Sequence, residues 1–140
     1  EALVAGAEKR VLAPMNLLQS KMVRTDRQVG DAAARIHASK QIFLGNARRI
    51  MECGRSGAAM SVQERADCRN NVAFAVQLSY EAMEIIFFAA GGSSLALDNP
   101  IQRAMRDMHA VKAHYFMDIE TTRELAGMIR LGKVPFTYIF

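Results

Sequence analysis

Apolar residues recur at helical spacing along most of the chain and divide it into four substantial segments. Residues 25–52 carry one apolar stripe near the 3.6-residue period. Residues 61–90 are polar in their first turns and apolar nearly all round from Val72, which predicts a helix whose second half is buried. Shorter helices are predicted over residues 99–114 and 118–131. The stripe of the first long helix comprises Ala33, Ile36, Phe43, Leu44, Ala47, Ile50 and Met51.

Short motifs mark the ends of these helices. Thr25–Gln28 and Ser61–Glu64 both have the capping-box pattern, in which a hydroxyl and a carboxylate or amide satisfy free N–H groups at a helix start. The Asn99–Pro100 pair predicts the start of the third helix. The Gly91–Gly92 pair predicts the end of the second, because glycine adopts the left-handed cap conformation without a steric cost. The glycines at positions 54 and 57 are expected to end the first.

The remaining pattern favours a purely helical fold. Residues 2–11 predict a short helix, and Pro14 predicts a loop over residues 13–24, because proline disfavours helix at the residue before it. No strand alternation of useful length occurs, so we expect an all-α, antiparallel (up-down) helical bundle without a sheet. The length of 140 residues predicts one domain, 1–140. The chain opens at Glu1 in what reads as the middle of a helix, so we expect a fragment of a longer protein.

Charge and composition limit the expected partners. The net charge is a modest +4 and the arginines are scattered, whereas nucleic-acid binding favours a concentrated basic patch, so no nucleic-acid partner is expected. Cys53 and Cys68 form neither a metal motif nor a disulfide framework, which favours a cytoplasmic protein with reduced thiols and no metal. The longest strictly apolar run, Ile85–Ala90, is far shorter than the ~20 residues of a membrane span, so no membrane association is expected.

The residues suited to a functional site gather between Gly91 and His114. The Gly91–Ser94 turn combines permissive backbone with hydroxyls and free N–H groups that can bind an anion. On the following helix Arg103 and Asp107 lie four residues apart and can pair. His114 lies seven residues after Asp107, so both are expected on roughly the same side of that helix.

The three histidines do not form a metal motif. His37 lies at the edge of the first long helix's stripe and is best explained as structural. His109 and His114 are five residues apart, about 140° around a helix, so they cannot chelate one metal as an i, i+4 pair can. No Glu-x-x-His motif, nucleophile elbow, P-loop or dinucleotide fingerprint occurs. Taken alone, each histidine is better explained by packing or by a helix end than by catalysis.

Several short motifs in this stretch resemble one known family. They are Gly91-Gly92, Asn99-Pro100-Ile-Gln-Arg103, Arg106-Asp-Met-His109-Ala and His114. Together they resemble the C-terminal domain of the acyl-CoA dehydrogenase fold, and within it the branch of flavin-dependent monooxygenases that hydroxylate aromatic compounds in two-component systems. The order of helices fits as well, so the resemblance covers essentially the whole chain. Family members are several times longer, and they also carry an N-terminal helical domain and a middle β domain.

The resemblance implies a function for the longer protein and roles for these residues. A separate flavin reductase would supply reduced flavin, either FAD or FMN, and O2 would be the co-substrate for hydroxylating a small aromatic or phenolic substrate. Gly91, Gly92, Ser93, Ser94 and Arg106 would contact the flavin. His114, ahead of His109, would be the catalytic histidine, because it is expected near the reactive edge of the flavin. The fold also implies a homo-oligomer, a dimer or a tetramer.

Two alternatives stay open from the sequence. The first is an acyl-CoA dehydrogenase-type oxidoreductase. Many such enzymes have a catalytic glutamate nine residues after the arginine of the Arg-Asp pair, where this chain has Tyr115, a poor base near neutral pH. The second is a non-catalytic oligomerisation module, because a bundle with a shortened first helix exposes apolar surface.

Overall fold

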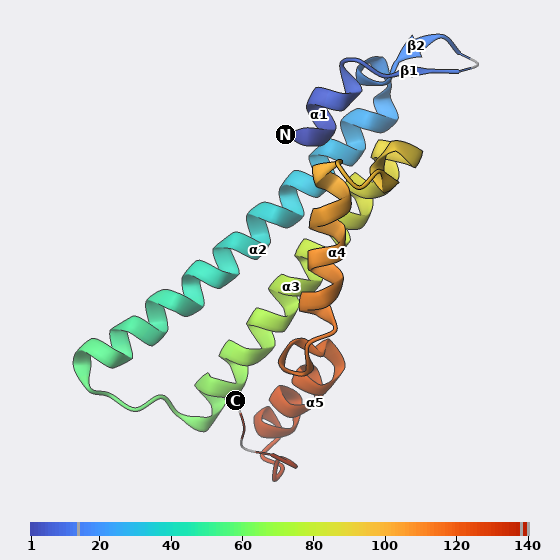
Figure 1. Cartoon of the computed structure of the whole chain (residues 1–140). Coiled ribbons are helices and arrows are strands. Elements are labelled where there is room, and N and C mark those ends of the chain that lie inside the picture. Colours follow the sequence, from blue (N-terminus) through green and yellow to red (C-terminus); the bar gives the residue numbers. More distant parts are fainter. Residues whose placement is uncertain (14, 138, 140) are drawn as a thin grey trace. The chain divides into compact units, whose positions relative to one another are not determined.

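The computed structural model describes every residue of the chain except Pro14, Tyr138 and Phe140 (Figure 1). The predicted helical fold is confirmed, with one small hairpin as an exception. Internal contacts divide the chain into two compact units. Unit 1 comprises residues 1–37 and 79–110, and unit 2 comprises residues 38–78 and 111–140. That the chain forms one domain stays a prediction.

Unit 1 contains the N-terminal elements, the start of one long helix, the end of the other and the glycine turn. Its elements are α1 (Ala2–Ala7), β1 (Val11–Leu12), β2 (Leu17–Leu18), the 3-10 turn η1 (Gln19–Lys21), the first part of α2 (Val23–Ser56), the last part of α3 (Val62–Ala90), the 3-10 turn η2 (Gly91–Leu95) and most of α4 (Pro100–Lys112).

The core of unit 1 is small and lies around the end of α3. Leu3, Ala89, Ala90 and Ile101 are buried together. Half-buried apolar side chains from α2 and α3 pack against this cluster: Val29, Met83, Ile86 and Phe87. The alanines let the neighbouring segments approach the α3 terminus closely, so this packing holds the glycine turn in place.

The expectation of a loop without a sheet before α2 was wrong. Strands β1 and β2 pair antiparallel, with Val11 opposite Leu18 and Leu12 opposite Leu17. Asn16 adopts a positive φ of 50° in the turn, a conformation that Asn tolerates better than most residues. Two strand residues on each side are too few to produce a visible alternation in the sequence, which is why the pattern missed them. Pro14, on which the loop prediction rested, lies outside the described residues.

Unit 2 is formed by the end of α2, the start of α3, the 3-10 turn η3 (Tyr115–Met117) and α5 (Ile119–Arg130). The predicted fourth helix is confirmed. Asp118 caps it, because its carboxylate accepts a hydrogen bond from the Thr121 N–H at 3.0 Å. A hydrogen bond from the Thr121 hydroxyl, followed by this N–H contact, holds the pKa of Asp118 below its usual value. Gly132 follows the helix with a φ of +69°.

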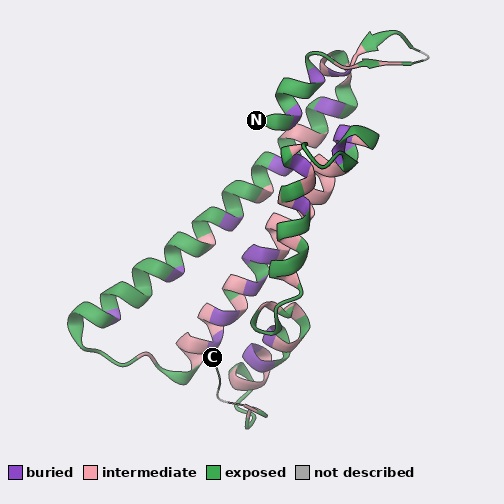
Figure 2. Cartoon of the chain, in the orientation of Figure 1, coloured by how far each residue is buried: buried purple, intermediate pink, exposed green. Residues whose placement is uncertain are grey.

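The predicted apolar stripe of α2 does not face the core. Figure 2 shows that most of α2 is exposed and that its buried residues recur at intervals. These buried positions are small or polar and follow a seven-residue spacing: Thr25, Ala32, Ser39, Asn46 and Cys53. In unit 2, Ser39 donates to the Ala75 carbonyl at 2.8 Å and Asn46 to the Cys68 carbonyl at 2.7 Å. Close backbone contact and these hydrogen bonds replace large side chains at the α2–α3 seam.

The exposed side of α2 instead carries the large apolar residues. Phe43 is 40% exposed and Ile50 is 53% exposed. The periodic apolar positions are present, but their large members stay exposed, whereas the buried positions are small or polar. A large apolar stripe that stays exposed on a helix is typical of an association surface.

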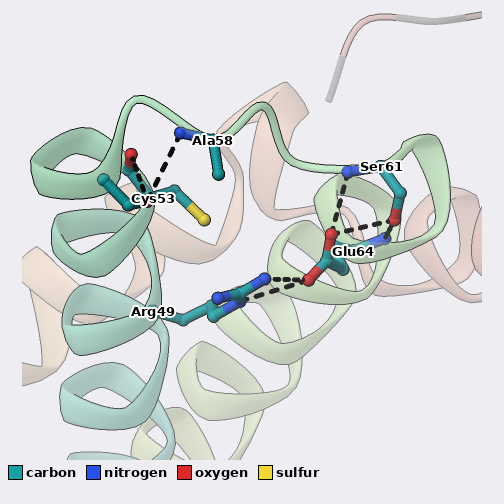
Figure 3. A network of polar contacts seen from close by, with 6 residues as sticks. Arg49, Cys53, Ala58, Ser61 and Glu64 are labelled. Atoms are coloured by element: carbon teal, nitrogen blue, oxygen red, sulfur yellow. Dashed lines mark hydrogen bonds and ion pairs between the residues drawn. The ribbon is translucent and has the colours of Figure 1, made fainter.

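The second capping box is confirmed and organises the turn between α2 and α3 (Figure 3). The Ser61 N–H donates to Glu64 Oε2 at 2.8 Å, and the Glu64 N–H donates to Ser61 Oγ at 3.2 Å. Glu64 also pairs with Arg49 from the end of α2, with Nε to Oε1 at 3.1 Å. The Arg49 contact is the main reason that the pKa of Glu64 falls to about 2.

Two helix ends differ from the sequence prediction. Helix α2 starts at Val23, and the N–H groups of Thr25 and Asp26 already bond the Met22 carbonyl, so the Thr25 capping box was wrong. Thr25 is instead buried. Helix α2 continues through Gly54 to Ser56 and ends where Gly57 adopts a φ of +69°.

Helix α3 with the turn that follows it, Val62–Leu95, is the one described segment long and apolar enough to cross a membrane by length and composition. The central helix of a helical bundle has the same composition. Glu81 in this segment pairs with Arg35 of α2, an arrangement typical of a packed helix pair. That no membrane is bound stays a prediction.

Candidate functional site

The end of α3 presents bare backbone at the surface of unit 1. Gly91 has a φ of +64°, so the predicted left-handed helix end is confirmed at this residue. Gly92, by contrast, does not need a positive φ, and a Cβ added there would meet nothing within 4 Å. Gly92 is exposed. The turn therefore offers an accessible stretch of main chain against which a flat ligand can lie.

Two side chains from the N-terminal segment hold this turn. Arg10 Nη1 donates to the Ala90 carbonyl, and Gln19 Nε2 donates to the Ala89 carbonyl at 2.7 Å. They donate to carbonyls at the helix end, and a cation there is favoured by the helix dipole. A Cβ on Gly91 would lie 2.9 Å from Arg10 Cζ. Glycine at position 91 is thus favoured by its backbone conformation, and a Cβ there would also require the end of the Arg10 side chain to move.

Arg10 was missed as a site residue by the sequence reading. It lies 80 residues before Ala90 in the chain, and no local motif marks it. The only available signal was its place near the end of the helix predicted over residues 2–11, which gives no indication of what it contacts.

A cavity of about 630 Å³ opens beside the turn. Its volume lies within the range usual for small-ligand sites. Two cations line it, Lys9 and Arg10, together with the uncharged polar side chains of Gln19, Ser93 and Asn99. Asp98 is the one acid among the lining residues described. The remaining walls are largely alanine, leucine, isoleucine and glycine. The cavity therefore suits a partly apolar ligand that carries an anionic group.

The sequence predicted that the two serines of the turn have hydroxyls available to bind an anion, but both hydroxyl protons are used within the turn. Ser93 Oγ donates to the Ala90 carbonyl at 3.0 Å, and Ser94 Oγ donates to the Gly91 carbonyl at 2.6 Å. Both hydroxyl protons therefore stabilise the helix end. Ser94 is also fully buried, whereas Ser93 is exposed and keeps lone pairs that can accept.

The start of α4 is tied to the same turn. Asn99 Oδ1 accepts from the Ile101 N–H at 2.9 Å, which confirms the predicted cap, and Asn99 Nδ2 donates to the Ser93 carbonyl at 2.9 Å. Arg103 and Asp107 do pair, at 3.8 Å, but both are exposed, so the pair contributes little stability. Arg106 lies exposed on the same helix. Whether it contacts a cofactor stays a prediction.

His109 has both ring nitrogens engaged within unit 1. Nδ1 lies 2.9 Å from the Met105 carbonyl and must donate to it, which leaves the lone pair of the neutral ring on Nε2. Nε2 lies 3.3 Å from the Tyr80 hydroxyl, and the two rings meet edge to face at 5.2 Å. Burial, followed by a hydrogen bond with Glu84, raises the pKa of Tyr80. These contacts fix the orientation of His109.

His114 lies beyond the end of α4, contrary to the prediction that it is part of that helix. Helix α4 ends at Lys112, and His114 caps the turn η3 in unit 2, where its Nδ1 accepts from the Phe116 N–H at 3.3 Å. Its ring stacks on Phe116 at 5.9 Å. The helical-wheel relation of His114 to Asp107 and His109 was therefore wrong, because no continuous helix joins them. Nε2 of His114 has no hydrogen-bond partner among the residues described.

Among the described residues, no three His, Cys, Asp or Glu side chains gather closely enough to hold a metal ion. Cys53 and Cys68 are both free thiols, and burial raises the pKa of Cys68. That the protein uses no metal stays a prediction.

Comparison with known proteins identifies relatives of the whole chain. Residues 1–119 match the sequence profile of the family described as acyl-CoA dehydrogenase, C-terminal domain. The oxygenase component of an FADH2-dependent resorcinol hydroxylase from Rhizobium sp. (strain MTP-10005) is 32% identical over 112 residues, which cover 77% of this chain and 27% of that protein.

Two solved structures have the same fold. XiaF from Streptomyces sp., in complex with FADH2 and glycerol, matches with a TM-score of 0.90 and 26% identity, over 96% of this chain and 34% of that chain. The HsaA monooxygenase from M. tuberculosis matches with a TM-score of 0.84 and 26% identity, over 99% of this chain and 35% of that chain. The chain thus spans about a quarter to a third of the length of these relatives. Its helical arrangement, its glycine turn and the profile match over most of its length place it in the acyl-CoA dehydrogenase C-terminal domain family.

Proposed function

We propose that this chain is the C-terminal helical domain of a flavin-dependent monooxygenase that hydroxylates a small phenolic substrate. The observation that carries the proposal is the turn at the end of α3, where accessible glycine backbone adjoins a cation-lined cavity. The relatives support it, because their names describe flavin-dependent hydroxylases and one was solved with FADH2. In two-component systems of this kind a separate flavin reductase supplies the reduced cofactor.

The residues of unit 1 fit the cofactor's shape and charge. Gly92 has no Cβ to keep a flat ring system from the main chain, and the space in front of it is open. Arg10 and Lys9 line the neighbouring cavity and would bind an anionic phosphate or the anionic reduced ring. Ser93 keeps hydroxyl lone pairs that can accept from a ring N–H. Bound reduced flavin supplies the electrons that activate O2 for transfer of one oxygen atom to the substrate.

His114 is the stronger of the two candidate catalytic histidines. In the neutral ring its Nδ1 accepts from Phe116, so Nε2 carries the proton and can hold a phenolate oxygen by hydrogen bonding. To accept the phenol's proton, the ring must rotate and give up only a weak 3.3 Å hydrogen bond. His109 would lose contacts at both nitrogens. His109 therefore has the positioning role in this proposal.

The acyl-CoA dehydrogenase alternative is disfavoured by the chemistry of position 115. Tyr115 is exposed and lies in η3, with its ring 5.7 Å from Phe116 and edge-on to it. A tyrosine hydroxyl is a poor base for removing a carbon-bound proton. This position offers no carboxylate to act as the base.

The apolar side of α2 supports a homo-oligomer, a dimer or a tetramer. In unit 2 it exposes Phe43, Leu44, Ile50 and Met51, whereas the small and polar residues Ser39 and Asn46 bond carbonyls of α3. A second copy of the same helix is self-complementary to such a stripe in a two-fold arrangement. The oligomer accompanies catalysis and does not replace it in this proposal.

The test is product formation by the complete protein with reduced flavin from a flavin reductase, O2 and a panel of phenols beginning with resorcinol. We expect hydroxylated product, and we expect His114→Ala to release peroxide instead, with hydroxylation about 10²–10⁴-fold slower. His109→Ala should reduce hydroxylation less. Oxidation of an acyl-CoA without any hydroxylated phenol would contradict the proposal.

A further inference from the structure

Unit 2 contains a buried arginine, Arg69, with two N–H donor groups that have no hydrogen-bond partner among the residues described. Arg69 of α3 is only 8% exposed. Its Nη1 donates to the Ile139 carbonyl, whereas Nε and Nη2 are buried without a hydrogen-bond partner among the residues described. A buried charge with unused donors is costly unless a counter-group is present. The two unused donors lie on the same edge of the guanidinium, the edge that binds a carboxylate through two parallel hydrogen bonds.

The acids of unit 2 that could neutralise Arg69 are engaged elsewhere. Asp67 pairs with Arg130 at 2.8 Å, and Glu64 pairs with Arg49. The Asp118 carboxylate bonds Thr121, and Arg69 affects it only through a smaller contribution to its lowered pKa. The charge of Arg69 is therefore balanced mainly by aromatic faces.

Those aromatic faces come from η3. The Arg69 guanidinium carbon lies 4.9 Å from the centre of the Phe116 ring and 5.8 Å from that of Tyr115. Cation–π contacts of this kind hold the guanidinium in place but leave its N–H edge free to donate. The edge is thus fixed in position before any anion arrives.

A cavity of about 500 Å³ lies against Arg69. A second cation, Arg65, lines it one helical turn away. The other walls are chiefly apolar: Ile50, Met60, Val72, Phe116 and Met117. Two cations in an apolar cavity suit a ligand with one anionic end and one apolar body.

We propose that this cavity binds a small amphipathic carboxylate, whose carboxylate pairs with the Nε–Nη2 edge of Arg69 and whose aromatic or branched body lies against the methionines and Phe116. The residues that line this cavity all belong to unit 2, and the proposal does not rest on the proposed flavin function. Acetate fills too little of the cavity, and a neutral amide offers one uncharged acceptor oxygen in place of the two anionic oxygens of a carboxylate.

The proposal is tested with benzoate on the 140-residue chain, by following the methyl NMR signals of its methionines. We expect saturable shifts at Met60 and Met117, with benzamide, the neutral isostere, binding about tenfold or more weakly. Arg69→Met, which replaces the aliphatic part of the arginine side chain but removes the guanidinium, should weaken benzoate binding by a similar factor. Arg123→Met, at an exposed arginine paired with Glu120, should not.

Three results would overturn the proposal. The first is failure of benzoate to shift either methionine. The second is equal affinity for benzoate and benzamide in the unmodified chain, a comparison that needs no variant to fold. The third is benzoate binding that a folded Arg69→Met chain retains in full.

Discussion

Replacing Gly91 by alanine should destabilise the chain, whereas the same change at Gly92 should not. Gly91 has a φ of +64° and lies against Arg10, while Gly92 has neither constraint. The pair is a matched test, because the two residues are adjacent in the same 3-10 turn. The two variants test whether the shape of the turn depends on Gly91 and its open surface on Gly92.

The magnitude follows from two contributions. Left-handed backbone costs an L-residue about 1–2 kcal/mol. The new Cβ would lie 2.9 Å from Arg10 Cζ, so the guanidinium must move. If its hydrogen bond to the Ala90 carbonyl is lost, about 1.5–3 kcal/mol more is lost, as is typical of a charged donor. With both contributions lost, we therefore expect Gly91→Ala to lower the free energy of unfolding by about 2.5–5 kcal/mol, and Gly92→Ala to change it by less than about 0.5 kcal/mol.

Urea titration followed by circular dichroism measures both variants. Repeating Gly91→Ala in an Arg10→Ala background separates the two contributions, because only the backbone cost of about 1–2 kcal/mol should remain. Equal effects of the alanine changes at 91 and 92 would refute the reasoning. An unchanged Gly91→Ala effect in the Arg10→Ala background would refute the part that concerns Arg10.

Three further predictions concern other parts of the chain. The Arg49 and Ser61 contacts that lower the pKa of Glu64 to about 2 stabilise the folded state at a pH above the unfolded value near 4.5, and this stabilisation is lost as the pH falls through 2. Arg49→Met should raise that pKa in a carbon-13 NMR titration, and an unchanged pKa would contradict the pairing. Tyr80→Phe should shift the His109 ring resonances and leave those of His114 unmoved; a matching shift at both would contradict the assigned contacts. Phe43→Glu with Ile50→Glu should shift sedimentation towards monomer, and an unchanged oligomer would exclude this stripe as the interface.

The fold was largely predictable because helix ends carry local chemistry. The Ser61 box, the Asn99 cap and the glycine at the end of α3 use side chains within a few residues of the groups they satisfy. The face of α2 was not predictable in the same way. Its seam of small and polar residues is recognisable only once Ser39 and Asn46 are seen to bond carbonyls of α3, since hydrophobic pattern alone favours the large residues.

The candidate site was predictable only in its local part. Gly91 and Gly92 were found because glycine has a distinctive backbone role. Arg10 and Arg69 were not found, because their importance comes from burial and from contacts 70 to 80 residues away in the chain. The helix was predicted to end at residue 114 but ends at Lys112, and this difference of two residues places His114 in the turn that follows α4.

The central claim is that the accessible backbone at Gly92 contacts the flavin, and anaerobic titration of the complete protein with reduced flavin tests it most directly. We expect Gly92→Leu to weaken binding about tenfold or more, because a side chain there occupies the space the ring would need. Gly54→Leu, at another exposed glycine with no neighbour within 4 Å of its added Cβ, should bind as the unmodified protein does. Unchanged flavin affinity in a folded Gly92→Leu protein would contradict the account.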